Sequence, residues 1–326
     1  MNASLIPKVR AVEPIVIRSR QIVGMLVGLD DGRILLFRPD QSIVPLTPFG
    51  APVSWLRLDA FWPYMMLADE VGNLLVSGLP GLQRLAWERP IMQAALFGGR
   101  LVAVDAEARV VGWSPSGDSA SYLEDMQGKP LRAHGLAVRY DDGSLVLRRG
   151  LGWTRLHVGD NGPGKRFVPV DGMDLRQQNG DVGLTRDGHH FYVYWDDLQV
   201  FDTASGELVR EAETDRYVYA TSLSNDGAFL AIGSRAGWLG VTGVDGDLVA
   251  QLEVGRADVT HAVISADGAV VAWCDRDGNA GLADVATSRQ LLSAEQVAAL
   301  LRETPEPAPE RGGSAPPAGY DPGPSL

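Results

Sequence analysis

The chain has 326 residues, of which 45% are hydrophobic, and its 29 basic and 41 acidic side chains give a formal net charge of −12 at pH 7. This negative balance opposes non-specific attraction to phosphate backbones and anionic lipids, and no segment approaches the roughly 20 apolar residues of a membrane-spanning helix. Composition therefore argues against nucleic-acid and membrane partners, while the apolar content supports a large folded core.

The N-terminal segment, MNASLIPKVRAVEPIVIRSRQ, contains no apolar run long enough for a signal peptide. Cys274 is the only cysteine, so neither an intrachain disulfide nor a cysteine zinc cluster is possible, which fits a reducing compartment. We therefore expect a soluble cytoplasmic protein that is a monomer by itself.

Short apolar runs separated by turn residues recur along the chain. The turns are marked by Gly32, Gly72, Ala108, Gly143, Asp196, Gly237 and Gly278, at intervals of 40, 36, 35, 53, 41 and 41 residues. Two and four positions after each marker the residue is apolar, except at Gly112, as in strands that turn alternate residues inward. Seven units of about 40 residues predict an all-β fold, a propeller of seven four-stranded antiparallel blades.

A further apolar run lies just upstream of each marker, for example QIVGMLVGL, HGLAVRY and AVVAWCD. These runs are nearly continuous, as expected of strands that are buried on both faces between neighbouring sheets. We interpret them as the third strands of the blades.

The last three units share an Asp-Gly turn, at Asp187-Gly188, Asp226-Gly227 and Asp267-Gly268. In this feature they resemble WD40 repeats, which have such a turn between their second and third strands. The segment LQVFDTASGELV, from Leu198 to Val209, is similar to the closing strand of the family, with Phe201-Asp202 in place of Trp-Asp. The resemblance covers roughly residues 185 to 292 and is faint before them, and the Gly-His pair of the family is missing throughout. It implies a divergent WD40-like propeller, a fold whose members usually scaffold protein complexes.

The chain divides into three predicted segments. Residues 1–292 are expected to form the propeller, with the strand from Arg289 to Leu292 completing the first blade so that no sheet edge stays unpaired. Ser293 and Gln296 are spaced as in a capping box, which predicts a short helix over 293–303. Residues 304–326 are rich in Pro, Gly and Ala and are expected to be disordered.

Two loops have a partial resemblance to ligand-binding motifs. The run from Gly159 to Lys165 has the spacing of a phosphate-binding loop, but Arg166 replaces the hydroxyl residue that holds magnesium, and a strand follows where a helix is required. We interpret it as a long surface loop, which leaves a binding role open. The run from Asp275 to Asn279 resembles the calcium loops of integrin-type propellers, but its later positions are out of step, and a plain hairpin turn is the preferred interpretation.

The sequence predicts no catalytic or metal-binding residues and no cofactor. Its five histidines lack the HExxH spacing of zinc hydrolases, and no GxSxG nucleophile motif occurs. Cys274 ends an apolar strand and is interpreted as a small buried hydrophobic residue rather than a nucleophile.

Aromatic residues occupy a turn that is polar in other units. The segment DAFWPY, 59–64, stands where the last three units have Asp-Gly. Phe61 and Trp62 either fold back against an adjacent blade or form a protein-binding hot spot. Together with Tyr64 and, on the same expected face, Lys165 and Arg166, they are the candidate protein-binding residues.

These patterns predict a non-catalytic scaffold that binds protein partners through one face of the propeller. Two alternatives stay open: a metal-dependent lactonase or hydrolase of the propeller type, and a sensor that binds a small ligand in the central channel. Several carboxylates pointing into the channel mouth would favour the enzyme.

Overall fold

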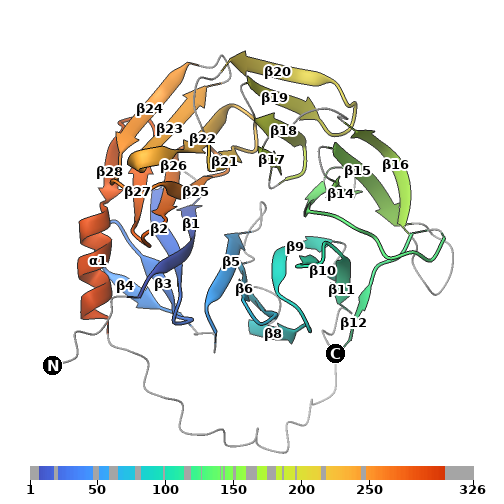
Figure 1. Cartoon of the computed structure of the whole chain (residues 1–326), viewed down its shortest axis with the longest axis horizontal. Coiled ribbons are helices and arrows are strands. Elements are labelled where there is room, and N and C mark those ends of the chain that lie inside the picture. Colours follow the sequence, from blue (N-terminus) through green and yellow to red (C-terminus); the bar gives the residue numbers. More distant parts are fainter. Residues whose placement is uncertain are drawn as a thin grey trace, which may run out of the picture.

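A computed structural model of the chain describes residues 7–17, 21–46, 51–58, 65–77, 82–97, 100–113, 119–125, 127–139, 141, 144–149, 152–158, 167–174, 181–185, 187–194, 197–213, 218–243 and 247–304. Their strands form seven antiparallel sheets of four strands each, arranged around a central axis (Figure 1). The structure is therefore the predicted seven-bladed propeller.

The strands follow one another in chain order, four to a blade, with the first strand of each blade nearest the axis (Figure 1). Blades one to three consist of β1 (Val9–Ile17), β2 (Gln21–Leu29), β3 (Ile34–Phe37), β4 (Ile43–Pro45), β5 (Val53–Leu58), β6 (Met65–Asp69), β7 (Asn73–Ser77), β8 (Leu82–Ala86), β9 (Ile91–Phe97), β10 (Arg100–Asp105), β11 (Val110–Trp113) and β12 (Ala120–Tyr122). Blades four and five consist of β13 (Gly135–Arg139), β14 (Ser144–Arg149), β15 (Gly152–Val158), β16 (Phe167–Asp174), β17 (Asp181–Leu184), β18 (His190–Tyr194), β19 (Asp197–Asp202) and β20 (Leu208–Glu213). Blades six and seven consist of β21 (Ala220–Leu223), β22 (Phe229–Gly233), the 3-10 turn η1 (Arg235–Gly237), β23 (Trp238–Gly243), β24 (Leu248–Glu253), β25 (Val259–Ile264), β26 (Val270–Asp275), β27 (Ala280–Asp284) and β28 (Arg289–Leu292), and helix α1 (Ala294–Glu303) follows.

This strand order gives the ring two different faces. The connections between blades lie on one face, together with the turns between second and third strands, and we call it the link face. Hydrogen bonds tie these two kinds of connection to each other: the N–H of Ala106 donates to the carbonyl of Pro90, and that of Arg276 to the carbonyl of Asp258, both at 2.9 Å. The turns between first and second strands, and between third and fourth strands, lie on the opposite face.

The observed order corrects the predicted position of several strands. The apolar runs upstream of the markers are second strands counted from the axis, not third strands. Two more strands of the same blade, the third and the fourth, follow each of these runs in sequence. The Asp-Gly pairs likewise connect first to second strands. Residues 59–64 also stand between a first strand, β5, and a second strand, β6.

Blade four is shifted further. The run HGLAVRY contains its first strand, β13, so the marker Gly143 precedes the second strand rather than the third. The turn equivalent to the other markers lies between Arg149 and Gly152. Counted from position 150, the intervals to Ala108 and Asp196 are 42 and 46 residues, close to the general period. The interval of 53 residues therefore reflects the assumed register and not an insertion.

The Asp-Gly turns are built by a buried hydroxyl and the aspartate. In blade six, the Ser224 hydroxyl donates to Oδ1 of Asp226 at 2.6 Å and accepts from the N–H of Phe229 at 3.0 Å, while Gly227 has a φ of +65°. Thr185 donates to Asp187, and Ser265 to Asp267, at 2.7 Å in the equivalent turns. The WD40-like Asp-Gly pairs therefore stabilise turns.

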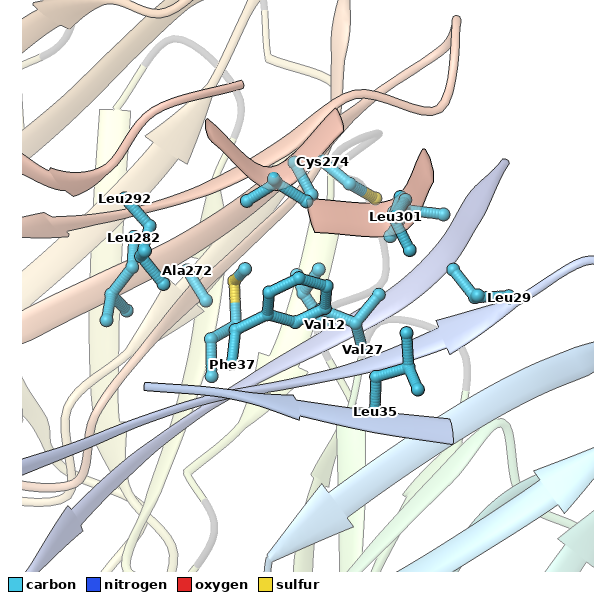
Figure 2. Packing of buried hydrophobic residues seen from close by; sticks show 14 of the residues in the cluster. Val12, Val27, Leu29, Leu35, Phe37, Ala272, Cys274, Leu282, Leu292 and Leu301 are labelled. Carbon is cyan, nitrogen blue, oxygen red and sulfur yellow. The ribbon is translucent and has the colours of Figure 1, made fainter. Parts of the chain in front are cut away.

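The ring closes without the predicted strand exchange. β28 pairs with β27 in blade seven, and blade one is completed by its own β4, so the prediction that the C-terminal strand completes blade one is wrong. A single cluster of buried side chains crosses the seam. It includes Val27, Leu35 and Phe37 of blade one, Ala272, Cys274 and Leu282 of blade seven, and Val297 and Leu301 of α1 (Figure 2). Burial of each aliphatic side chain of this size contributes about 1.5–3 kcal/mol.

Helix α1 covers the seam between the first and last blades (Figure 1). It begins at the predicted capping box: the Ser293 hydroxyl accepts from the N–H of Gln296 at 3.3 Å, and Oε1 of Gln296 accepts from the N–H of Ser293 at 2.8 Å. Packing of a helix therefore replaces strand exchange at the seam, because Val297 and Leu301 bury their side chains there. The tail predicted to be disordered lies, from residue 305 on, outside the described residues.

Candidate functional site

The binding residues predicted from sequence lie outside the described residues. Phe61, Trp62 and Tyr64 belong to the connection between β5 and β6, and Lys165 and Arg166 to that between β15 and β16. β5 is a first strand and β15 a third strand, so both end on the face opposite the link face. The blade-to-blade connections leave the fourth strands on the link face.

The first strands of all seven blades surround a channel along the axis. Its cavity has a volume of about 460 Å³ and is lined by residues on or next to each of these strands. This volume is within the range of small-molecule pockets. Glu13 is the one carboxylate among the described residues that line it.

Polar side chains of the channel wall hold neighbouring blades together. Oε1 of Glu13 accepts a hydrogen bond from the N–H of Leu58 at 3.3 Å, and Glu13 is 2% exposed. Oε1 of Gln93 accepts from the N–H of Leu136 at 3.1 Å, and the Ser222 hydroxyl from that of Ile264 at 3.3 Å. Each donor belongs to the first strand of the next blade, where an inner sheet edge would otherwise leave N–H groups unpaired. These polar groups are therefore part of the framework.

β-Bulges occur where first strands begin at the link face. The pairing skips Ser54 in β5, Met92 in β9 and Thr260 in β25, and all three residues line the channel. A bulge re-aims the side chain of the extra residue, and bulges are frequent next to functional sites. Met92 is 56% exposed, whereas Ser54 and Thr260 are half-buried.

Tyr219 lies at the same channel mouth, next to the start of β21, and is 41% exposed. Nε of Arg235 donates to its hydroxyl at 2.9 Å, and the guanidinium carbons of Arg235 and Arg276 each lie 5.9 Å from the centre of its ring. Arg276 also pairs with Asp258 at 3.1 Å. Tyrosine and arginine are enriched among the residues that dominate binding energies at protein interfaces.

A second hollow on the link face adjoins the channel mouth, and we call it the basic hollow. It has a volume of about 550 Å³ and is lined by Asp125, Lys129, Pro130, Arg132, His134 and Arg149. His134 lines both the hollow and the channel. The lining residues come from the connection between blades three and four and from the end of β14. A local excess of positive charge therefore lies on a chain whose net charge is −12.

Cys274 in the core contacts His261 of the channel wall, with Sγ 3.3 Å from Nδ1. Burial raises the pKa of the Cys274 thiol to about 12, and the residue is 1% exposed, so little thiolate forms near neutral pH. His261 has an exposed surface in the channel, yet the surrounding wall lowers its pKa by desolvation. The structure places Cys274 in the hydrophobic core, as predicted from its sequence context.

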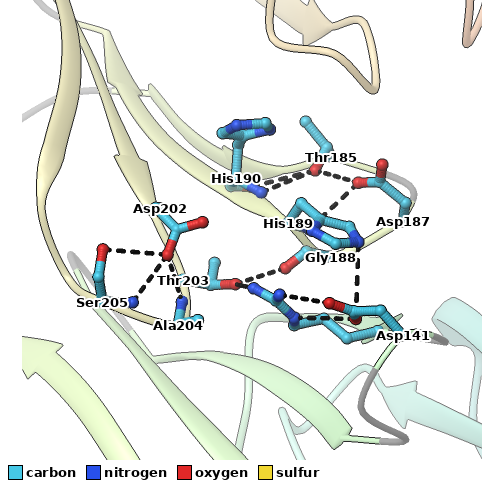
Figure 3. Close-up of polar contacts among 11 residues, drawn as sticks. Asp141, Thr185, Asp187, Gly188, His189, His190, Asp202, Thr203, Ala204 and Ser205 are labelled. Atoms are coloured by element: carbon cyan, nitrogen blue, oxygen red, sulfur yellow. Dashed lines mark hydrogen bonds and ion pairs between the residues drawn. The ribbon is translucent and has the colours of Figure 1, made fainter.

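A polar network on the opposite face joins blades four and five (Figure 3). Arg139, which is 6% exposed, donates to the Thr203 hydroxyl at 2.9 Å and to Asp141 at 2.7 Å. The Thr203 hydroxyl donates to the carbonyl of Gly188 at 2.7 Å, and Nε2 of His189 lies 3.6 Å from Oδ1 of Asp141. These groups bind one another and the backbone of a turn, so the network fixes the two blades relative to each other.

Asp275, the first residue of the calcium-like run, is used within its own turn. Its Oδ1 accepts from the N–H groups of Asp277 and Asn279 at 3.0 and 2.9 Å, and its Oδ2 from Nδ2 of Asn279 at 2.8 Å. Asp69 and Asn73 make the equivalent contacts in blade two. The run is therefore the hairpin turn between β26 and β27, as preferred from sequence. Among the described residues, no group of three or more His, Cys, Asp or Glu side chains is placed to hold a metal ion.

No family model and no curated protein matches the chain. Among solved structures, the chain is similar to the β-propeller domain of Cps50 (Swd1) from Myceliophteria thermophila, with a TM-score of 0.65 over 84% of this chain and 95% of that domain. The chain has a WD40-like propeller fold. Sequence identity to Cps50 is 12%, so the likeness is one of fold.

The link-face residues of this WD40-like propeller were not identified from sequence. Met92 lies in a first strand and Tyr219 next to one, and the positions of these strands depend on the strand order that the sequence analysis shifted by one. Their signal is an apolar residue where equivalent first strands have polar ones, as Met92 compares with Ser54 and Thr260. Within the described part of the WD40-like propeller, no helix is long and apolar enough to span a bilayer.

Proposed function

We propose that this WD40-like propeller is a non-catalytic platform for protein partners in the cytoplasm and binds them through the link face around the channel mouth. The observation that carries the proposal is the exposure of Met92 and Tyr219, at 56% and 41%, beside Arg235 and Arg276. Exposed apolar side chains rimmed by polar groups are typical of protein-binding surfaces. In this proposal the protein is a monomer by itself, and its partners bury the exposed side chains at the channel mouth.

The opposite face is a second candidate surface, favoured by the sequence pattern. Phe61, Trp62 and Tyr64 replace the polar turn of other blades, and Lys165 and Arg166 follow β15, which ends on the same face as β5. A platform with two binding faces joins two partners within one assembly. Variants on each face separate the two contributions.

The channel offers less support for the enzyme alternative. A metal-dependent hydrolase needs several carboxylates or histidines converging on one ion. Glu13, the carboxylate of the described lining, accepts a backbone hydrogen bond from the next blade instead. A small-ligand sensor would use the same cavity, and its ligand would have to contact side chains that already hold the blades together.

The test compares two pairs of substitutions in the tagged full-length protein, expressed in its native cells. Met92→Ser with Tyr219→Ser removes two exposed apolar side chains from the link face. The control pair, Leu208→Ser with Leu248→Ser, removes two side chains that are each 46% exposed on the outer strands β20 and β24. We expect co-purifying proteins to fall at least about tenfold for the first pair alone, because hot-spot residues contribute about 2 kcal/mol or more each. Equal recovery with both pairs, at unchanged melting temperature, would show that the link face is not the binding surface.

A further inference from the structure

We propose that the basic hollow binds carboxylate side chains of an acidic segment in a protein partner that lies across the link face. The inference rests on the proposed function, because the hollow adjoins the channel mouth on the same face. It adds a chemical class to the partner: an extended peptide that carries acidic residues and at least one apolar residue.

Three cations and one carboxylate, Asp125, line the hollow, and Lys129 and Arg149 both interact electrostatically with this carboxylate. Lys129, Arg132 and Arg149 have exposed side chains, and none of them forms an ion pair with another described residue. Elsewhere on the link face, Arg10 binds Glu70 at 3.5 Å and Arg109 binds Glu107, whereas Lys8 and Arg256 form no ion pair with a described residue. Three cations without a close ion pair therefore line one hollow.

Asp125, the acidic residue of the hollow, is held by its own turn. Its Oδ1 accepts from the N–H groups of Gln127 and Lys129 at 2.8 and 3.0 Å. Nε of Arg149 donates to the carbonyl of Arg132 at 3.2 Å, which fixes the guanidinium at the wall. The remaining guanidinium nitrogens have no hydrogen-bond partner among the described residues. Guanidinium groups held in this way bind carboxylates through two parallel hydrogen bonds.

Charge and location favour a short acidic peptide over a long polyanion. A nucleic acid extends over many phosphates, and the net charge of −12 repels it beyond the few cations of the hollow. The hollow also lies beside an exposed apolar residue, Met92. Gln93 of β9 accepts a hydrogen bond from the N–H of Leu136 in β13, so these two first strands are neighbours. Met92 and His134 lie at their starts, and both line the channel mouth. A peptide with a carboxylate in the hollow can therefore place an apolar side chain on Met92.

Fluorescence anisotropy with the full-length protein tests this assignment. The probe is a fluorescein-labelled peptide of three Glu-Ala-Glu-Leu repeats, and its matched control has Gln in place of every Glu. We expect the Glu peptide to bind at least tenfold more tightly than the Gln peptide and to dissociate as salt rises from 50 to 300 mM. Equal binding of the two peptides, or no binding of either, would overturn the proposal.

Variants then locate the site. Arg132→Gln with Arg149→Gln should weaken binding of the Glu peptide at least tenfold. Arg38→Gln with Arg289→Gln removes two exposed arginines from the opposite face, so the net charge changes equally and binding should change less than twofold. Equal losses with the two pairs would assign the effect to net charge and reject the hollow. Unchanged melting temperatures show that each variant is folded.

Two further experiments identify the class of molecule that occupies the hollow. In the first, uridine-rich RNA of 12 nucleotides should compete at least tenfold more weakly than the unlabelled Glu peptide. Stronger competition would assign the hollow to nucleic acid. Deletion of residues 305–326, which include Glu306, Glu310 and Asp321, should leave affinity unchanged, whereas tighter binding would make this tail the occupant in place of a partner. The peptide results test the acidic segment, while recovery of partners by the Met92 and Tyr219 variant tests the proposed function separately.

Discussion

The N–H of Val9, the first residue of the first strand, donates a 3.2 Å hydrogen bond to the carbonyl of Gly278 in the last blade. The two ends of the ring therefore meet as neighbouring blades, each complete in itself. Nη1 of Arg33 in blade one adds a 3.2 Å hydrogen bond to the carbonyl of Thr304 after α1. A helix and a close backbone approach hold the seam in place of a shared sheet.

Substitution of Gly278 by Ala tests this close approach. Gly278 has a φ of +88°, and an added Cβ would lie 2.7 Å from Cβ and 3.0 Å from Cα of Lys8. Gly206 is the matched control, since its φ is +74° and nothing lies within 4 Å of an added Cβ. We expect Gly206→Ala to lower the free energy of unfolding by about 1 kcal/mol through backbone strain alone, and Gly278→Ala by distinctly more. Equal losses in urea unfolding would mean that the seam tolerates the shift of Lys8.

The turn at Asp275 gives a second stability test. Asp275→Ala leaves the N–H groups of Asp277 and Asn279 without their acceptor, so we expect a loss of about 1–3 kcal/mol in the free energy of unfolding. Asp277→Ala is the control, because this residue is exposed and should change stability by less than about 0.5 kcal/mol. Calcium should not raise the melting temperature of the wild type. A rise that Asp277→Ala abolishes would restore the calcium-loop alternative.

His190 predicts how stability depends on pH. Burial is the main cause that lowers its pKa below the ordinary value of 6.5, and Nδ1 lies 3.2 Å from the carbonyl of Asn225. His190 therefore binds a proton at a higher pH in the unfolded chain than in the folded chain. The stability that the neutral His190 side chain contributes is complete above pH 6.5 and is lost as pH falls below it.

We expect the melting temperature of His190→Gln to decline less steeply than that of the wild type between pH 6.5 and pH 5. His261 acts in the same direction, since desolvation by the surrounding channel wall lowers its pKa as well, so a double variant should be flatter still. Leu208→Ala changes no titratable group and should preserve the wild-type slope. An unchanged slope in His190→Gln would contradict the assignment.

The fold was accessible from sequence because the period of about 40 residues and the alternation after each marker arise from the repeating blade itself. The turns at Asp226-Gly227 and its equivalents were recognisable for the same reason: one hydroxyl and one carboxylate close each turn locally. Closure was not predictable in this way. Residues 289–292 satisfy the pattern of an outer strand in either blade, and the side-chain packing of Val297 and Leu301 decides between them.

The link-face site depends on features that sequence spacing does not encode. Met92 lies at a bulge of β9, and the spacing of residues in the sequence does not show where the strand pairing skips a residue. Arg132 and Arg149 are 17 residues apart and meet because the connection between blades three and four returns beside the end of β14. Their convergence follows from the path of the chain, whereas Trp62 stood out in the sequence because it breaks the repeat.

Trp62→Ala decides what this departure from the repeat means. If Trp62 packs between blades, truncation should lower the free energy of unfolding by roughly 3 kcal/mol or more, as expected for a buried tryptophan. If it is an interface anchor on the opposite face, the isolated protein should melt almost as the wild type does while one set of partners is lost. We expect the second result, because the polar Asp-Gly turns of other blades serve the same connection without an aromatic residue.

Melting and partner recovery are measured on the same preparation, with the Met92 and Tyr219 variant in parallel. Loss of the same partners by both variants at unchanged stability would mean that one partner contacts both faces, and a large stability loss in Trp62→Ala would leave the link face as the platform's binding surface.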